Sequence, residues 1–579
     1  MDVQLRRRVA GAAAAALGIA TVVAGGDHRA AASPRETAGG HAAGLAGINH
    51  IVMIYEENHS YDNLFGLWES TDGLANEPGP DNTPRHTQRA PDGSTLSCLP
   101  QNDVNLTAPP LAVTCTGTNA GQPVSSAFRN VPFRIDDHIA PTDTTCPAPG
   151  VFAPNGMAKG QGQPGGCTRD MVHRYYNEQY QIHGGRMDRY VAGSDAAGLA
   201  MGYYDTRALP IYRYLHSPGA PHYAVSDYLF QGTFGGSFLN HQWLISAQPP
   251  VFANAVHDGG PNDLHSVVGP DGLPAGTPLH PATPGTKDAA LTQAANPDGS
   301  CAVPANGPTP PPRTTCGDYA VNTIQPPYQP YAPGTSAARR LPPLTTPTIG
   351  DRLSAAGVDW AWYSGGWSNA DGDVGGPGWT NGSTPGACTD PRTATGAVWP
   401  NCPNATFQYH HQAFNYYANY APGTAARAAH LRDEAELITA ARAGELRPVS
   451  IVKPIGLENE HPGYASEHLG SDHLVDLIKA IEEGPDAADT MIVVTYDEFG
   501  GSWDHVPPPS HVPGISDRWG PGTRVPGLVI SPRLARPFTV DDIAHDTTSV
   551  LATIEHRFGL APLGTRDAAV ADFSGLFRR

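Results

Sequence analysis

Four uninterrupted apolar runs stand out along the chain, and each has the length of a β-strand. They cover residues 49–55, 448–453, 490–496 and 526–531 and are rich in β-branched side chains. Continuous apolar runs of this length are typical of strands buried on both faces of a largely parallel sheet. The pattern therefore predicts one strand near the start of the chain and three strands near its end.

Helical periodicity accompanies the late strands. Apolar side chains recur with helical spacing in residues 425–443, 471–483 and 546–558. Ser471 and Asp546 are candidate N-caps, because short polar side chains accept hydrogen bonds from the free amides of a first helical turn. Strands that alternate with helices predict an α/β core built in layers.

Two long stretches, at about residues 77–166 and 256–347, do not follow this pattern. They are rich in Pro, Gly, Thr and Asn and hold most of the cysteines. Neither contains enough periodic apolar sequence to form a core of its own. We therefore interpret them as irregular insertions in a single domain that spans residues 45–579.

The first 32 residues have the pattern of a signal peptide. Three arginines, Arg6–Arg8, precede an uncharged Ala-rich run over 9–26, and small residues at 30–32 offer a cleavage site. This arrangement predicts export to the cell surface or beyond, and the paired arginines suit the twin-arginine route. A membrane anchor is the alternative, but a spanning helix needs roughly 20 apolar residues, which this run does not reach.

The chain has eight cysteines, an even number that predicts disulfides in an exported protein. No cysteine spacing is typical of a zinc finger. The clustering of the cysteines favours pairs between neighbours, namely Cys98–Cys115, Cys146–Cys167, Cys301–Cys316 and Cys388–Cys402.

The formal net charge of −19 argues against nucleic acid as the main partner. Nucleic-acid backbones are held by lysine and arginine, which are outnumbered here. A small phosphorylated substrate is compatible with this charge if a metal ion and histidines supply local positive charge. No stable protein partner is predicted.

Polar residues follow the first and third apolar runs at the points where the strands would end. Glu57 and Asn58 follow the first run, and Asp497 and Glu498 follow the third. Active sites of open α/β sheets lie beyond the carboxyl ends of their strands. Oxygen ligands from two strand ends can converge on one divalent ion, so the sequence predicts a single metal ion. Calcium, magnesium, manganese, iron and zinc all accept such ligands.

Ser237 is the candidate nucleophile. Gly235 and Gly236 precede it and allow a sharp turn that a substrate oxygen can approach closely. A serine in this position can attack phosphorus if a metal ion lowers the pKa of its hydroxyl, although Gly and Ser are more often simply turn residues. The elbow of carboxylesterases is excluded, because Leu239 stands where that motif requires glycine.

Three of the 24 histidines lie in dense polar and aromatic surroundings. His173 precedes a tyrosine-rich segment, His411 lies between aromatic residues, and His461 follows Asn459 and Glu460. Taken singly, each is more often a structural histidine. A phosphoesterase, however, needs donors around the phosphoryl oxygens and an acid for the leaving group, and histidine can serve as both.

These segments together resemble the acid phosphatase/phospholipase C superfamily of phosphoesterases. Residues 49–66 are similar to its opening signature, and residues 496–506 are similar to its second signature. The resemblance implies an alkaline-phosphatase-like core, in which helices sandwich a sheet, with long disulfide-stapled loop insertions. Shorter similarities extend over most of the chain, at residues 184–188, 460–462, 524–526 and 548–551.

The resemblance also assigns metal ligands. Glu57 and Asn58 match the first pair of ligands of the family, and Asp497 and Glu498 match the second pair. The acid phosphatase branch commonly has Asp at the last of these positions, so Glu498 departs from its pattern.

The resemblance also implies which residues are catalytic. Ser237 falls where the family has its nucleophile, three residues before Asn240. His173, His411 and His461 align with histidines that surround the phosphate. The implied mechanism is attack by Ser237 to form a phosphoserine, protonation of the leaving oxygen by His461 or His411, and hydrolysis of the intermediate by water.

The implied function is a secreted, metal-dependent phosphoric-ester hydrolase. Ser237 and residues 408–412 resemble the acid phosphatase branch, which favours phosphomonoesters as substrates. A phospholipase C that cleaves phospholipid headgroups is the alternative, and it would need an apolar rim or a lid beside the site. An alternative of another class is a catalytically inactive surface binding protein on the same fold.

Overall fold

A computed structural model of the chain describes the following residues: 44–77, 84–100, 111–141, 168, 170–194, 196–252, 319–331, 335–337, 340–371, 407–464, 466–510 and 514–577. The expected signal peptide and the cysteines from Cys146 onward lie outside them. Among the described residues, none of the helices combines the length and the apolar character needed to cross a membrane.

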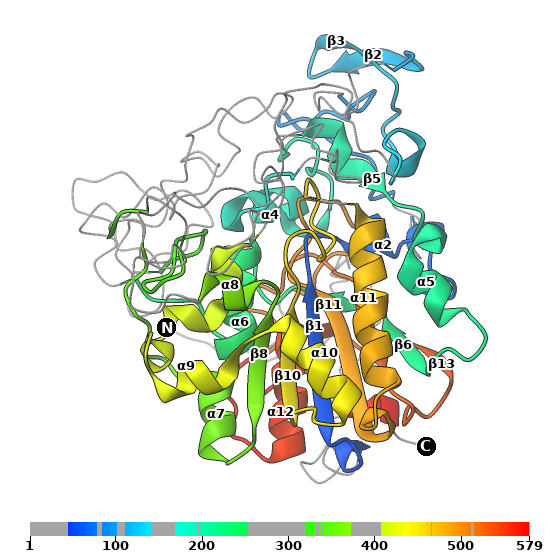
Figure 1. The fold of residues 1–579 in the computed structure, drawn as a ribbon. Coiled ribbons are helices and arrows are strands. Elements are labelled where there is room, and N and C mark those ends of the chain that lie inside the picture. Colours follow the sequence, from blue (N-terminus) through cyan, green and yellow to red (C-terminus); the bar gives the residue numbers. More distant parts are fainter. Residues whose placement is uncertain are drawn as a thin grey trace, which may run out of the picture.

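The core contains an eight-stranded sheet with the strand order β13–β6–β12–β11–β1–β10–β8–β9 (Figure 1). Strand β1 lies in the middle, parallel to both β10 and β11, whereas β12 runs antiparallel to its two neighbours. The four predicted strands are therefore confirmed within one residue at each end. The strands are β1 (His50–Glu56), β6 (Tyr223–Ser226), β8 (Trp360–Ser364), β9 (Leu431–Asp433), β10 (Val449–Lys453), β11 (Thr490–Tyr496), β12 (Gly527–Ile530) and β13 (Phe538–Asp541).

Helices cover both faces of this sheet, which confirms the predicted α/β layers. Alternate residues of each central strand point to opposite faces, so Val52 and Ile54 join one apolar cluster while Ile51 and Met53 join the other. The first cluster includes α5 (Pro210–Leu215), α10 (Glu434–Ala443) and α11 (Glu467–Glu482); the second includes α6 (Ser237–Ser246), α7 (Ile349–Ala355) and α12 (Thr548–Phe558).

The helix predicted over residues 425–443 is interrupted, and this part of the prediction is wrong. Helix α9 (Ala425–His430) ends where β9 pairs in parallel with β8 as an edge strand. Helix α10 begins directly after Asp433. The Asp433 side chain is its N-cap and forms a capping box with Glu436. The edge pairing of β9 therefore divides an otherwise continuous helical pattern.

The other two helices start at different residues from those predicted. Helix α11 begins four residues early, with Ser466 as its cap, and Ser471 Oγ instead accepts a hydrogen bond from the amide of Ile211 (3.0 Å). Helix α12 begins at Thr548. Asp546 lies in the short strand β14 (His545–Asp546), and its Oδ1 still accepts from the amide of Thr548 (2.7 Å).

The structure describes part of each predicted insertion. In the first, Cys98 forms a disulfide with Cys115 at the start of a hairpin, which confirms one predicted pair. In the second, residues 319–331 and 340–347 contribute Ile324, Leu341 and Leu344 to the core. The hairpin and the remaining short elements are β2 (Cys115–Asn119), β3 (Gln122–Ser126), β4 (Phe133–Arg134), β5 (Gly202–Tyr203), β7 (Leu229–Phe230), α2 (Tyr61–Leu64), α4 (Tyr175–Ile182) and α8 (Trp367–Ala370).

Candidate active site

The carboxyl ends of β10, β1 and β11 lie side by side at one edge of the sheet. Because all three strands are parallel and in register, Glu56 lies opposite Tyr496 and Lys453 follows the last β1–β10 pair. The residues that come next, Glu57 and Asp497, are therefore brought together although 440 positions separate them in the chain. This is the edge where the sequence predicted the site.

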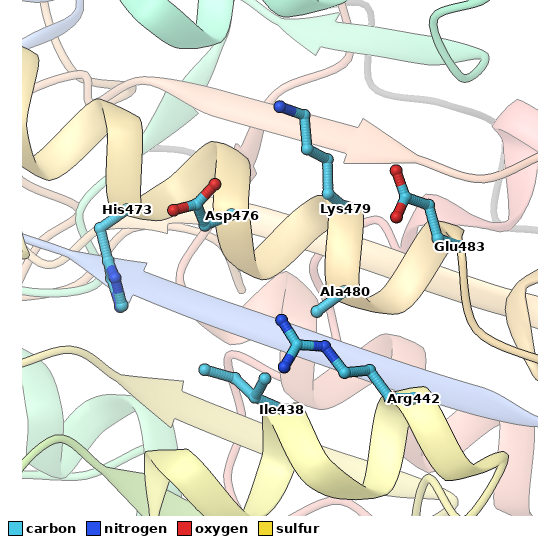
Figure 2. A pocket seen from close by; sticks show the side chains of 7 residues that line it. All are labelled: Ile438, Arg442, His473, Asp476, Lys479, Ala480 and Glu483. Atoms are coloured by element: carbon cyan, nitrogen blue, oxygen red, sulfur yellow. The ribbon is translucent and has the colours of Figure 1, made fainter.

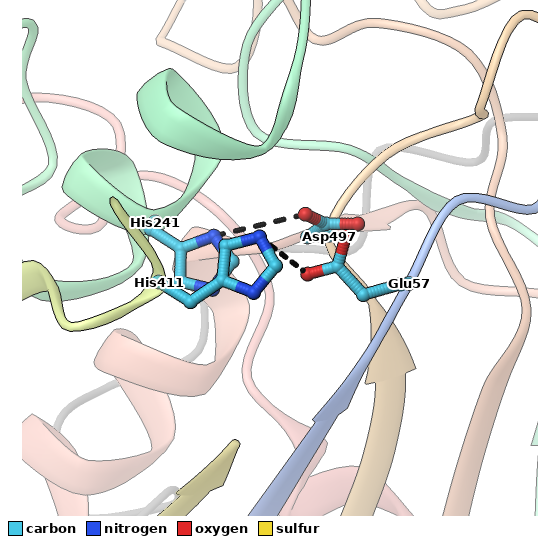
Figure 3. A group of neighbouring side chains, drawn as sticks. All are labelled: Glu57, His241, His411 and Asp497. Carbon is cyan, nitrogen blue, oxygen red and sulfur yellow. Dashed lines mark ion pairs between the residues drawn. The ribbon is translucent and has the colours of Figure 1, made fainter. Parts of the chain in front are cut away.

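Four buried side chains form a potential metal-binding group at this edge (Figure 3). Glu57, His241, His411 and Asp497 each offer one ligand atom, and these atoms lie within 4.8 Å of one another. His411 Nε2 is 3.2 Å from Glu57 Oε1, and His241 Nδ1 is 3.7 Å from Asp497 Oδ2. Two predicted ligands thus meet one predicted catalytic histidine.

His241 was not predicted. It lies one helical turn after Ser237 on α6, and its ring stacks on that of His411 with centroids 4.8 Å apart. Its Nδ1 donates to the carbonyl of Ser237 (2.7 Å), so Nε2 carries the lone pair, and this buried atom has no hydrogen-bond partner within the described part of the chain. The i, i+4 spacing from the candidate nucleophile was the available signal in the sequence.

Asn58 lies beside this group in a left-handed conformation (φ 62°), which asparagine tolerates better than most residues. Its backbone amide donates to Asp497 Oδ1 (3.2 Å), and its Nδ2 is 2.9 Å from His461 Nε2. His461 Nδ1 donates to the carbonyl of Pro462 (2.7 Å), so its Nε2 must accept from Asn58. The side-chain amide of Asn58 is thereby oriented, and its buried Oδ1 has no donor in the segments that the structure describes.

Glu498 links the group to His173. Glu498 Oε2 accepts from the amide of Gly500 (2.6 Å), and Glu498 Oε1 lies 3.4 Å from His173 Nε2. His173 Nδ1 donates to the carbonyl of Met171 (2.6 Å). The histidine side chain is 15% exposed, more than those of His411 and His461, so His173 faces the more open side of the site.

Ser237 is the first residue of α6, and its hydroxyl donates to Glu57 Oε2 at 3.3 Å. The turn before it requires glycine at position 235, where φ is +98° and a Cβ atom would lie 2.8 Å from the backbone nitrogen of Tyr175. The predicted nucleophile is therefore in direct contact with a predicted metal ligand.

Glu178, which sequence reasoning missed, holds the turn in place. Its Oε2 accepts from the amide of Gly235 (2.6 Å) and from Gln231 Nε2 (2.9 Å). Its Oε1 accepts from both the amide and the hydroxyl of Thr523 (2.7 and 2.8 Å). Burial raises the pKa of Glu178 to about 8, and these hydrogen bonds act in the opposite direction.

Lys453 was also missed. It is the last residue of β10, and its side chain is buried against the end of β1. Its Nζ forms an ion pair with Glu57 Oε1 and donates to the carbonyls of Tyr55 (2.9 Å) and Glu56 (3.3 Å). A lysine at the end of an otherwise apolar strand was the signal, since lysine is almost never fully buried unless it is paired.

Electrostatics at the site favour a bound cation. Burial raises the pKa values of Glu57, Asp497 and Glu498, and the charge of Asp497 adds to the effect on the two glutamates. The Lys453 ammonium lowers the pKa of Glu57 and Asp497 and offsets part of this penalty. A divalent ion would stabilise all three carboxylates in their charged form.

The histidines are held neutral. Burial lowers the pKa of His241, His411 and His461, and neighbouring positive groups, Lys453 among them, lower it further. Neutral imidazole is the form that binds metal ions and accepts hydrogen bonds.

Buried oxygen atoms are a second observation that indicates a metal ion at this site. Asn58 Oδ1, Asp497 Oδ2 and Glu498 Oε1 are buried and have no hydrogen-bond donor among the described residues. Buried acceptors without a partner are costly, and a cation supplies that partner. Carboxylate and amide oxygens with imidazole groups beside them suit any of the five divalent ions named above.

A second acidic group beside the site is already neutralised. Asp62, Asp504 and His505 lie close enough for a metal ion, but Arg524 donates to Asp62 (3.1 Å) and to Asp504 (3.1 Å). His505 Nδ1 also pairs with Asp62 (2.6 Å). The guanidinium and the imidazole provide the charge that an ion would bring, and they join α2, which follows β1, to the segment after β11.

A cavity of about 580 Å³ lies elsewhere, between α10 and α11 (Figure 2). Both positive and negative side chains line it, and it contains none of the residues of the candidate site. Its lining residues are Ile438, Arg442, His473, Asp476, Lys479, Ala480 and Glu483.

Comparison with known proteins identifies the family of the chain. The Phosphoesterase family matches residues 48–561. Phospholipase C B of Mycobacterium tuberculosis is 36% identical over 159 residues, which cover 24% of this chain and 30% of that protein. Non-specific phospholipase C6 of Arabidopsis thaliana is 28% identical over 22% of this chain and 30% of its own length. Non-hemolytic phospholipase C of Burkholderia pseudomallei is 31% identical over 20% of this chain and 19% of its own length. Because the family match extends over most of the sequence, the chain belongs to the Phosphoesterase family.

Proposed function

We propose that the protein is an exported, metal-dependent phosphomonoesterase with Ser237 as its nucleophile. The observation that carries the proposal is the position of the Ser237 hydroxyl, 3.3 Å from Glu57 Oε2 and within a buried group of potential metal ligands. A serine hydroxyl needs such surroundings to become a nucleophile at neutral or mildly acidic pH.

The metal ion would be held by Glu57 and Asp497, together with Asn58 Oδ1 and Glu498 Oε1. When bound, the ion lowers the pKa of the serine hydroxyl and stabilises negative charge on the phosphoryl oxygens. The buried oxygens without donors support this ligand set.

The reaction proceeds in two displacements. Ser237 Oγ forms a bond to phosphorus while the ester P–O bond breaks, and the hydroxyl proton passes to Glu57 Oε2, the acceptor already in contact with it. The leaving oxygen takes a proton from an acid and departs as an alcohol. Water then attacks the phosphoserine, and the serine oxygen recovers a proton as phosphate leaves.

His173 is the acid best supported by the geometry. Its Nδ1 donates to the carbonyl of Met171, which leaves Nε2 as the ring nitrogen that can exchange a proton with the substrate. Both ring nitrogens of His461, by contrast, are engaged with Pro462 and Asn58. We assign to His461 the role of orienting Asn58, and to His411 a contact with Glu57 and the phosphoryl group.

Small soluble esters are the favoured substrates. Among the described residues, the large apolar side chains that are exposed are Val113, Val131 and Val251, and none of them belongs to the candidate site. A lipid-directed enzyme needs an apolar surface at the site itself. Phospholipase C activity is the second candidate, because the relatives named above are phospholipases C.

A direct assay tests the proposal. The purified mature protein would be given a chromogenic aryl phosphate and phosphatidylcholine, before and after chelation, beside the Ser237→Ala variant. Chelator-sensitive release from the aryl phosphate that Ser237→Ala loses is the expected result. Hydrolysis of the lipid alone would establish the second candidate, and near-native turnover by Ser237→Ala would refute the nucleophile.

A further inference from the structure

Glu434, Glu458 and His473 form a cluster of potential metal ligands apart from the candidate active site. Each of them offers one ligand atom, and these atoms lie within 4.8 Å of one another. His473 Nε2 is 2.7 Å from Glu434 Oε1 and 3.8 Å from Glu458 Oε2. Three elements meet here, because Glu434 is the first residue of α10, His473 lies on α11, and Glu458 follows β10.

The carboxylate of Glu434 has one oxygen atom that His473 does not satisfy. Glu434 is 5% exposed, and its Oε2 has no hydrogen-bond partner in the described part of the chain. A buried carboxylate oxygen without a partner is costly, and a metal ion beside it would remove that cost. This oxygen atom is therefore an observation, separate from the clustering, that indicates a bound cation.

The charges around His473 also favour a cation. Burial lowers the pKa of His473, but nearby carboxylates outweigh burial and raise it above its usual value. These carboxylates belong to Glu434, Glu458 and Asp476. Within the described ranges, neither Glu434 nor Glu458 forms an ion pair with a lysine or an arginine. A divalent ion beside a neutral imidazole would balance the charges of the two glutamates.

The cluster can be reached from solvent. The Glu458 side chain is 42% exposed, and His473 also lines the cavity between α10 and α11. Figure 2 shows His473 and Asp476 at one end of this cavity and Glu483 at the other. An ion can therefore enter the cluster, and water can complete its coordination.

We propose that Glu434, Glu458 and His473 bind a zinc ion at a site separate from the candidate active site. Imidazole and carboxylate groups are zinc ligands, and many zinc ions have three protein ligands with water in the fourth position. Manganese, magnesium and calcium ions favour sites with more ligands, most of them oxygen atoms. The inference does not depend on the proposed phosphomonoesterase activity.

The zinc ion would restrain the segment that leads to His461. Glu458 lies three residues before His461, whose Nε2 accepts from Asn58. Between them, the carbonyl of Asn459 accepts from the backbone amide of Glu57 (3.0 Å). An ion that joins Glu458 to α10 and α11 therefore stabilises backbone that lies directly beside the candidate active site.

Zinc binding by the wild type and two variants tests the site. His473→Ala removes the imidazole ligand, and Glu458→Ala removes a partly exposed carboxylate ligand. His216→Ala is the matched control, because His216 also pairs with a glutamate, Glu69 (2.6 Å), but belongs to no ligand cluster among the described residues. Each mature protein would be freed of metal with chelator and dialysed against Zn²⁺, and the zinc bound per chain would be measured by mass spectrometry.

The wild type and His216→Ala should bind one more Zn²⁺ per chain than His473→Ala or Glu458→Ala. Loss of a ligand should weaken binding of this ion at least about 10-fold, so the counts are compared at Zn²⁺ concentrations that just saturate the wild type. Equal counts in the wild type and a folded cluster variant would overturn the inference, as would loss of an ion in His216→Ala. Thermal unfolding checks folding, and Glu458→Ala decides alone if His473→Ala does not fold.

The same measurement with Mn²⁺ gives the manganese count per chain. This count should be equal in the wild type, His473→Ala and Glu458→Ala, because Mn²⁺ favours sites with more oxygen ligands. A manganese count that falls together with the zinc count would overturn the assignment to zinc.

Discussion

The carboxylate of Glu57 lies between the hydroxyl of Ser237 and the ammonium of Lys453. Its Oε2 accepts from Ser237 Oγ at 3.3 Å, and its Oε1 forms an ion pair with Lys453 Nζ. One carboxyl group from the end of β1 therefore contacts the first residue of α6 and the last residue of β10. The candidate nucleophile and the candidate metal ligands are therefore joined by direct side-chain contacts.

Replacement of Ser237 by alanine should abolish turnover and leave metal binding intact. Loss of a nucleophile lowers kcat by about 1,000-fold or more. The measurement is kcat on an aryl phosphate together with the manganese count. Ser246→Ala, at the far end of the same helix, is the matched control and should keep its activity. An equal loss of activity in both variants would point to disruption of α6 instead.

Replacement of Asp497 by asparagine should have opposite effects on the loaded and the metal-free protein. Burial raises the pKa of this carboxyl, so removing the charge should raise the Tm of the metal-free form. The same change removes a ligand, so added Mn²⁺ should no longer raise Tm. Thermal unfolding with and without Mn²⁺ measures both effects, with Asp92→Asn in an exposed turn as the control. A Tm increase with Mn²⁺ equal to that of the wild type would exclude Asp497 as a ligand.

The Glu178 carboxyl group should control how fast the nucleophile reacts. In Glu178→Ala, all four donors around this group lose their partner. We expect kcat to fall about 10- to 100-fold, because small displacements at a reacting atom have effects of this size. KM and the manganese count should stay near the wild-type values. A rise in KM with unchanged kcat would contradict a role in placing the turn before Ser237.

The contribution of Glu467 to folding stability should fall as pH rises from about 4.5 to about 8. Burial raises the pKa of Glu467, on α11, to about 8, against about 4.5 in an exposed chain. Between these values the folded protein holds a proton that the unfolded chain releases, so stability decreases with rising pH. Glu467→Gln should therefore stabilise the metal-free protein by about 2 kcal/mol at pH 7 and flatten its pH profile. Denaturant unfolding from pH 5 to 8 tests this, and Glu445→Gln, at an exposed position, should leave the profile unchanged.

The central strands were predictable because their apolar runs report burial on both faces, as Thr490–Tyr496 shows. The division of residues 425–443 was not predictable, because Leu431–Asp433 are extended only through their pairing with β8. Helical periodicity is a local property, whereas an edge strand depends on a partner distant in the chain. Tertiary context overrides local propensity in such cases.

In the candidate site, too, some residues could be predicted from the sequence and others could not. Glu57 and Asp497 could be found because each follows an apolar run directly, and sheet topology then brings the two together. Lys453 and His241 carry only weak signals, a lysine at a strand end and a histidine one helical turn after Ser237, and Glu178 carries no motif. Their importance comes from contacts that the fold creates, such as the ion pair between Lys453 and Glu57.

Arg524 bridges Asp62 in α2, shortly after the proposed ligands Glu57 and Asn58, and Asp504, shortly after the proposed ligands Asp497 and Glu498. This bridge is entirely internal to the protein and needs no ion. The two segments that carry the proposed ligands are thus held together by the protein itself. We therefore expect the metal-free enzyme to keep its ligands in place. Such a centre would lose and regain its ion without refolding, so the availability of metal in the surroundings could switch the enzyme off and on again reversibly.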